Sequence, residues 1–183
     1  MLLALDISTS CTGYCLFDED ELIDIGSINL SKHKGLFEKA TQVKADIIKL
    51  NKKFNITHVA VEENLQAFRP GLSSAKTLMT LAQFNGVVRW ICHENLNVPV
   101  EAINVNTARK SVGLKIDKKD KSKTTKEKVL DWVSEDNPSI RWPTKILKSG
   151  PNKGQKRICG EAYDMADAYV IGKSFLIENN SNA

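Results

Sequence analysis

Four carboxylates are the side chains of this sequence whose types and spacing could do chemistry together. Asp6 and Glu62 each follow an apolar run that is typical of a buried strand, which would place both acids at the rim of a sheet. Asp164 and Asp167 are three residues apart in a segment with helical patterning, so both should project on one side. Two strand ends and one helix face can converge on a single point. Because hard divalent cations such as Mg²⁺ take clustered oxygen ligands, the sequence predicts a metal site there.

Each of these acids has a less specialised alternative role. Asp6 could form a turn after its strand, and Asp164 and Asp167 could complement the dipole at the start of a helix. Glu63 could replace Glu62, since the two residues are adjacent. Neighbouring side chains of a strand point to opposite faces, so only one of these two can face the other acids, and we favour Glu62.

The distribution of charge points to a polyanionic substrate. The net charge is only +4, but residues 108–128 hold nine Lys/Arg against three Asp/Glu, and residues 138–160 hold six Lys/Arg and no acid. The remainder of the chain is therefore acidic. Basic segments beside an acidic metal site suit an enzyme that cleaves a polyanion, because the lysines attract phosphates and the metal neutralises the scissile one. The alternative for either segment is an ordinary solvated lysine surface.

Length and composition argue against membrane and disulfide-rich classes. The 183 residues suggest one domain, which we place at 1–178, followed by a frayed tail at 179–183. No run approaches the ~20 apolar residues that span a bilayer, and the N-terminus lacks the pattern of a signal peptide. We therefore expect a cytoplasmic protein without a membrane partner. The four cysteines form no C-x-x-C pair and are expected to be reduced thiols, not a disulfide framework or a zinc site.

Apolar patterning predicts an α/β domain. Three strands in succession would form a meander, and helices and strands then alternate, which gives a mixed five-stranded sheet with helices on both faces. Two basic loops are expected, at about 113–123 and at 138–160. The expected strands are 2–7, 14–17, 22–30, 56–62 and 98–105, and the expected helices are 34–53, a helix capped by Ser73 or Ser74 and ending at 94, 106–112, a helix capped by Thr124 or Thr125 and ending at 133, and 161–177.

Three motifs together resemble the catalytic blocks of the RuvC-like Holliday junction resolvases, in order and in spacing: L-A-L-D-I-S-T-S-C-T-G-Y, V-A-V-E-E-N and Y-D-M-A-D-A-Y-V-I. The resemblance implies a ribonuclease H-like fold and a metal-dependent endonuclease that cuts four-way DNA junctions. It also implies two Mg²⁺ ions, with Mn²⁺ as a substitute, and no organic cofactor. Asp6 would bridge both ions, Glu62 would hold one, and Asp164 with Asp167 would hold the other. Because a four-way junction has two-fold symmetry, a homodimer is expected.

The sequence departs from the usual family pattern at the first motif. Ile-Ser-Thr-Ser follows Asp6, whereas bacterial members usually have Pro-Gly-Ser at this place. The sequence therefore resembles the divergent phage branch of the family. This suggests a bacterial or phage-infected host. The family's junction wedge falls at Leu65, with Phe68 nearby. T-T-K-E-K-V-L-D-W-V resembles the family's DNA-contacting helix, which suggests Lys126 as a phosphate ligand. The full set of expected DNA contacts is Leu65, Phe68, Arg69, Lys110, Lys126, Arg141, Lys145, Lys148, Lys156 and Arg157.

Three other functions compete with a resolvase. Another nuclease of the same fold, such as a YqgF-like enzyme acting on branched DNA or RNA, would use the same acids, whereas ribonuclease H proper would need its second acid on the first helix, at Glu38. A sugar-kinase or actin-like phosphotransferase resembles the motif around Asp6 but needs two lobes and many more residues. A nucleic-acid-binding module without catalysis would keep the basic loops but need not keep four acids.

Overall fold

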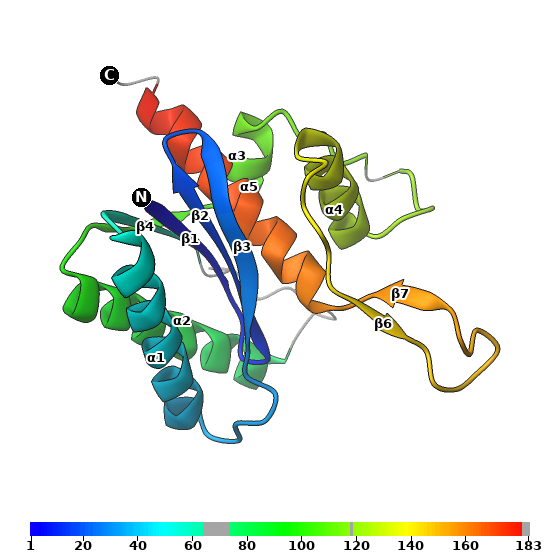
Figure 1. The fold of residues 1–183 in the computed structure, drawn as a ribbon, viewed down its shortest axis with the longest axis horizontal. Coiled ribbons are helices and arrows are strands. Elements are labelled where there is room, and N and C mark those ends of the chain that lie inside the picture. Colours follow the sequence, from blue (N-terminus) through cyan, green and yellow to red (C-terminus); the bar gives the residue numbers. More distant parts are fainter. Residues whose placement is uncertain (64–73, 118, 181–183) are drawn as a thin grey trace.

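A mixed sheet of five strands forms the centre of the computed structural model, which describes residues 1–63, 74–117 and 119–180. The strands are β1 (Leu2–Ile7), β2 (Cys11–Asp18), β3 (Glu21–Asn29), β4 (His58–Glu62) and β5 (Val100–Ile103). Their order is β3-β2-β1-β4-β5, so β1 is central (Figure 1). It pairs antiparallel with β2 and parallel with β4, while β3 and β5 form the edges. The predicted meander and mixed sheet are confirmed.

Helices cover both faces of this sheet, as predicted. They are α1 (Leu36–Phe54), α2 (Ala75–Leu96), α3 (Val105–Ser111), α4 (Thr125–Asp136) and α5 (Glu161–Asn180). Alternate residues of β1 point to opposite faces: Leu3 and Leu5 pack with the apolar sides of α1 and α2, whereas Leu2 and Ala4 pack with α5, α3 and α4. Figure 1 shows the same two layers. Within the described parts of the chain, no helix is both long and apolar enough to cross a membrane.

Side-chain caps set where three of the helices begin. Ser74 Oγ accepts a hydrogen bond from the Thr77 amide at 3.1 Å, and Thr124 forms a reciprocal capping box with Glu127. Both belong to the predicted pairs of candidate caps. Asn104 caps α3 through its side-chain oxygen. Because a cap residue leaves the extended ladder, β5 ends one residue before Asn104, and the strand predicted over 98–105 is shorter in the structure.

The prediction that 138–160 is a loop without regular structure is wrong. The segment contains a separate antiparallel hairpin of β6 (Thr144–Ile146) and β7 (Lys156–Ile158). Its connecting turn is closed by two backbone hydrogen bonds between Leu147 and the Gly154–Gln155 pair. Strands of three residues are too short to show an alternating pattern, and both are largely exposed, so no buried face marks them in the sequence. The hairpin extends away from the sheet (Figure 1).

Helix α5 holds α3 and α4 in place on its side of the sheet. The Tyr169 ring packs on Phe17 of β2, with 5.4 Å between ring centroids, and its hydroxyl donates to Asp136 of α4 at 2.7 Å. Ser111 of α3 donates to Ser174 of α5 at 2.8 Å. The three helices therefore form one packed layer over the sheet. These contacts hold α3 and α4 in place relative to α5. The helix reaches Asn180, three residues beyond its predicted end.

Candidate active site

Two of the four carboxylates lie side by side at one end of the sheet. Asp6 and Glu62 follow Leu5 and Val61, which are paired in the parallel ladder of β1 and β4. The Asp6 and Glu62 carboxyl groups share a hydrogen bond. Glu63 points elsewhere and accepts a hydrogen bond from the Asn104 side chain at 3.1 Å. The carboxyl ends of two adjacent parallel strands thus bring two acids together, and Glu62 is the member of its pair that faces Asp6.

Gly13 lets α5 bring the other two acids to the same place. It is paired with Asp6 across β1 and β2, and a Cβ atom at this position would collide with the backbone of Asp164 and Met165. A glycine is therefore required for this close approach of helix to strand. The sequence predicts a second strand over 14–17, but β2 begins at Cys11 and runs through Gly13. The first turns of α5 consequently lie against the strand beside Asp6.

All four acids line one pocket of about 730 Å³. They come from three segments that are far apart in the sequence, the ends of β1 and β4 and the start of α5. Two cationic side chains from α3 and α4 and the polar turn after β1 complete the lining. The polar and charged residues of the pocket are Asp6, Ser8, Ser10, Asn29, Ser31, Glu62, Arg109, Lys126, Glu161, Tyr163, Asp164 and Asp167.

The acids of this pocket are desolvated and repel one another. Burial, followed by the neighbouring Glu62, Asp167 and Asp164, raises the pKa of Asp6 well above its usual value. Burial also raises the pKa of Asp167, although the Arg109 guanidinium opposes the shift. Groups whose ionisation is disfavoured by burial and by like charges are typical of functional sites, because a structural role does not require such a cluster.

Lys126 and Arg109 partly neutralise the cluster. Lys126 Nζ lies 3.0 Å from Asp164 Oδ1, and Arg109 Nη2 lies 3.2 Å from Asp167 Oδ1. Burial alone would lower the pKa of Lys126, but Asp164, Asp167 and Asp6 raise it, and the net direction is upward. The sequence prediction named Lys126 and Lys110 but missed Arg109. Adjacent residues of a helix point about 100° apart, and the rotation of the short helix α3 about its axis is set by packing that its sequence alone does not reveal.

The donor set suits a hard divalent cation. Among the described residues no three Asp, Glu, His or Cys side chains already form a compact metal-binding group, and cationic partners engage Asp164 and Asp167. The chemistry nevertheless fits, because burial and then the neighbouring acids Glu62, Asp167 and Asp164 raise the pKa of Asp6. A bound cation would offset the repulsion among these acids. The residues that would hold it are the four predicted acids.

The remaining predicted DNA contacts lie outside this pocket. Lys110 lines an adjoining hollow beside Arg109. Five basic residues are exposed in and before the hairpin, and none of them lines the carboxylate pocket: Arg141, Lys145, Lys148, Lys156 and Arg157. Leu65, Phe68 and Arg69, which include the predicted junction wedge, lie outside the described residues.

Comparison with known proteins identifies the fold. No protein-family model matches the sequence, and no curated protein matches it. Among solved structures, Thermus thermophilus RuvC in complex with a Holliday junction substrate is similar at 17% identity and a TM-score of 0.65, over 98% of this chain and 94% of that one. A second structure of Thermus thermophilus RuvC has 16% sequence identity and a TM-score of 0.61, over 99% of this chain and 96% of that one. The yeast mitochondrial Holliday junction resolvase Ydc2 has 14% identity and a TM-score of 0.55, over 99% of this chain and 81% of that one. The chain thus has the ribonuclease H-like α/β fold of the RuvC-type Holliday junction resolvases.

Proposed function

We propose that this protein is a structure-selective DNA endonuclease that resolves four-way junctions by metal-dependent hydrolysis of phosphodiester bonds. The observation that carries the proposal is the convergence of Asp6, Glu62, Asp164 and Asp167 in one pocket of a fold shared with two resolvases. A non-catalytic DNA-binding module would have no reason to gather four acids in one pocket, two of which, Asp6 and Asp167, have pKa values raised by burial. The basic surface around the pocket supports a nucleic-acid substrate.

The four carboxylates would hold Mg²⁺, or Mn²⁺ in its place, and the cation would supply an activated water and neutralise the leaving oxygen. Water attacks the phosphorus, the bond to the 3′ oxygen breaks, and the products carry a 5′ phosphate and a 3′ hydroxyl. Arg109, whose side chain is mostly buried, keeps Asp167 oriented. The Lys126 side chain is 56% exposed, so it can turn from Asp164 toward a phosphate of the substrate. Binding of DNA and release of Asp164 would then be coupled.

The finer features of the proposal follow from the substrate. Symmetric incision of a junction calls for a homodimer with two such pockets. Lys145, Lys148, Lys156 and Arg157 of the hairpin, together with Arg141, would contact phosphates of the junction arms. The junction wedge would be Leu65 or Phe68, with Arg69 as a further contact. No organic cofactor or membrane partner is needed, and the expected location is the cytoplasm of a bacterium or of a phage-infected host.

A cleavage panel tests the function. Purified protein would be incubated with Mg²⁺ and end-labelled substrates of matched sequence: a four-way junction, a flap, a linear duplex and an RNA–DNA hybrid. We expect paired cuts near the branch point of the junction and little cutting of the duplex. Equal cutting of junction and duplex would contradict the resolvase proposal, and preferential cutting of the hybrid or of RNA would favour another nuclease of this fold.

The matched control for the panel is Asp6→Asn, which keeps the shape of the side chain but removes its charge. We expect it to abolish cleavage, by at least about a hundredfold, while junction binding measured by fluorescence anisotropy stays within a few-fold of the wild type. Cleavage that survives this substitution would contradict the assignment of the metal site. Binding without cleavage by the wild-type protein, over a range of divalent metals, would favour the non-catalytic module.

A further inference from the structure

Three hollows adjoin one another along α3 and α4, beginning at the carboxylate pocket. Arg109 lines both the carboxylate pocket and a second hollow of about 430 Å³. Ile116 and Thr125 line both that second hollow and a third one of about 360 Å³. Because consecutive hollows share wall residues, they lie next to one another in a row that leads from the four acids to the loop before α4. We call this row of hollows the lysine track.

Beyond the carboxylate pocket, the walls of the lysine track carry more lysine and arginine than acid, and no aromatic side chain among the described residues lines them. The second hollow is lined by Arg109, Lys110 and Lys115, without an acid. The third hollow is lined by three lysines, one of them Lys121, and by two acids, Asp117 and Asp120. Lys110, Lys115 and Lys121 are exposed, and within the described residues no ion pair engages them. Positive charge without a surface for stacking bases suits the phosphates of a nucleic-acid strand and makes binding independent of sequence.

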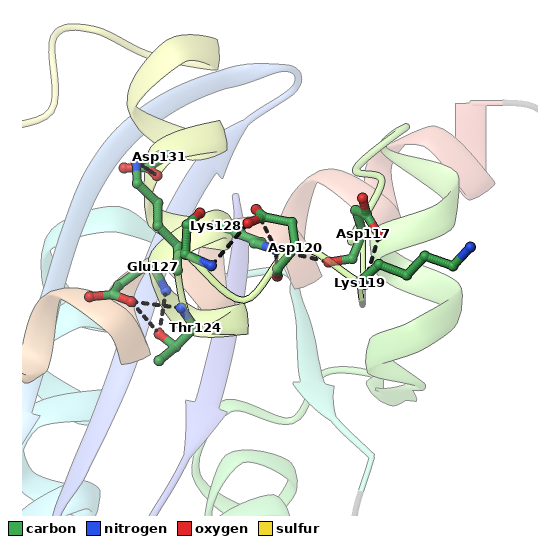
Figure 2. A network of polar contacts seen from close by, with 9 residues as sticks. Asp117, Lys119, Asp120, Thr124, Glu127, Lys128 and Asp131 are labelled. Atoms are coloured by element: carbon green, nitrogen blue, oxygen red, sulfur yellow. Dashed lines mark hydrogen bonds and ion pairs between the residues drawn. The ribbon is translucent and has the colours of Figure 1, made fainter.

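The loop that forms the far end of the track is held in a defined shape. Lys128 Nζ donates to the carbonyl oxygens of Asp117 and Asp120, at 2.8 and 2.6 Å, and lies 2.9 Å from the Asp120 carboxylate. Figure 2 shows Lys128 pointing from α4 to these residues. The Asp120 carboxylate also accepts a hydrogen bond from the Ser122 amide at 2.9 Å. One lysine thus binds both flanks of the turn and neutralises Asp120, one of its two acids, and the other, Asp117, accepts a hydrogen bond from the Lys119 amide at 2.8 Å.

We propose that the lysine track binds the sugar-phosphate backbone of one DNA strand as it leaves the carboxylate pocket. Arg109 would lie where the strand passes from the scissile phosphate to the track, and Lys110, Lys115 and Lys121 would contact successive phosphates beyond it. Lys128 is a positioning residue that shapes the loop without touching DNA. The proposal rests on the proposed nuclease function for its direction, since the strand is taken to start at the four acids, but its binding step can be measured separately.

The test is the salt dependence of binding to a fluorescein-labelled four-way junction in the absence of divalent ions. A triple variant, Lys110→Gln, Lys115→Gln and Lys121→Gln, would be compared with a control triple variant on α1, at the other face of the sheet: Lys44→Gln, Lys52→Gln and Lys53→Gln. We expect the track variant to weaken binding by at least about tenfold. A plot of the logarithm of the association constant against the logarithm of the salt concentration should also become less steep by about 3. Each phosphate that a lysine no longer neutralises reduces the magnitude of this slope by about 1. The control variant should change the slope by less than about 1.

Failure of this proposal and failure of the nuclease function give different results. Equal salt slopes for the two variants would overturn the lysine track, whatever the wild-type protein cleaves. If the track variant has the reduced slope but the wild-type protein cleaves no substrate, the track stands as a nucleic-acid surface and the nuclease proposal falls. Circular dichroism of both variants would verify that these exposed substitutions leave the fold intact.

Discussion

At the scale of single residues, ionising Asp6 in the candidate active site is unfavourable, and a bound cation would reduce this cost. Burial of Asp6, followed by the charges of three neighbouring acids, keeps the pKa of its carboxyl group well above the usual value. An acid with a raised pKa in the folded state is protonated more readily there than in the unfolded chain, so its ionisation costs stability as the pH rises. The metal-free protein therefore carries a penalty at neutral pH that comes from its candidate active site.

This penalty predicts that Asp6→Asn stabilises the metal-free protein. At pH 7.5 and without divalent ions the variant should have the higher Tm, by roughly 2–4 °C for each kcal/mol of repulsion removed. The difference should shrink as the pH falls through the raised pKa of Asp6 toward about 4, the ordinary pKa of Asp, and disappear below it, where the wild-type side chain is protonated in both states. Thermal unfolding followed by circular dichroism at several pH values measures it. An unchanged or lower Tm at pH 7.5 would mean that Asp6 is stabilised by contacts that outweigh the repulsion.

At the scale of elements, the geometry of the site depends on how closely α5 approaches β2. Gly13 and Gly172 both lie where a Cβ atom would collide with the facing element, with the backbone of Asp164 in one case and with the Phe17 ring in the other. Backbone cannot move aside as the end of a flexible side chain can. Gly13 is therefore the position at which the distance between helix and strand, and with it the position of Asp164, is set.

Gly13→Ala should separate the acids and weaken the fold. We expect a loss of about 1–3 kcal/mol in the free energy of unfolding, the usual cost of overpacking, and a fall in cleavage of at least about tenfold. Gly86→Ala is the matched control for stability, since no atom lies within 4 Å of its added methyl group and alanine favours the helix interior by about 0.5–1 kcal/mol. Urea unfolding measures the stability of both variants, and cleavage of the junction by Gly13→Ala is compared with the wild type. A Gly13→Ala variant as stable as the control and as active as the wild type would contradict the close contact of α5 with β2.

The elements that the sequence predicted are those whose pattern is local. β1 and β4 are continuous apolar runs, each ending in an acid, and the motif around Asp164 and Asp167 lies on a long helix, so the positions of the four acids could be inferred without a structure. The β6–β7 hairpin could not be inferred from the sequence, because its strands are short and exposed. The role of Arg109 could not be inferred either, since its position against Asp167 depends on how α3 packs on α5. Contacts between elements are not encoded in the periodicity of one element.

At the scale of the whole molecule, the α1–α2 layer has exposed apolar side chains among the residues that the structure describes. Phe37 is 79% exposed and Trp90 is 59% exposed, and with Leu36 and Val87 they line a groove of about 600 Å³ between the two helices. Exposed apolar surface of this kind is typical of interaction sites. A second copy of the chain is the occupant that the proposed function requires, because a two-fold symmetric interface would give two carboxylate pockets for the two strands of a junction.

Trp90→Glu should therefore convert a dimer into a monomer. A buried glutamate on both sides of a symmetric interface is desolvated and repelled by its own copy, so we expect the dimer dissociation constant to rise by at least about a hundredfold. Sedimentation velocity measures the assembly, and a cruciform plasmid distinguishes paired incision, which gives linear product, from single nicks, which give open circles. The variant should nick without linearising. Ile146→Glu, at an apolar hairpin residue that is 66% exposed, is the matched control for the sedimentation measurement only and should stay dimeric. A wild-type protein that is monomeric at micromolar concentration, or a Trp90→Glu variant that still linearises the plasmid, would contradict this interface.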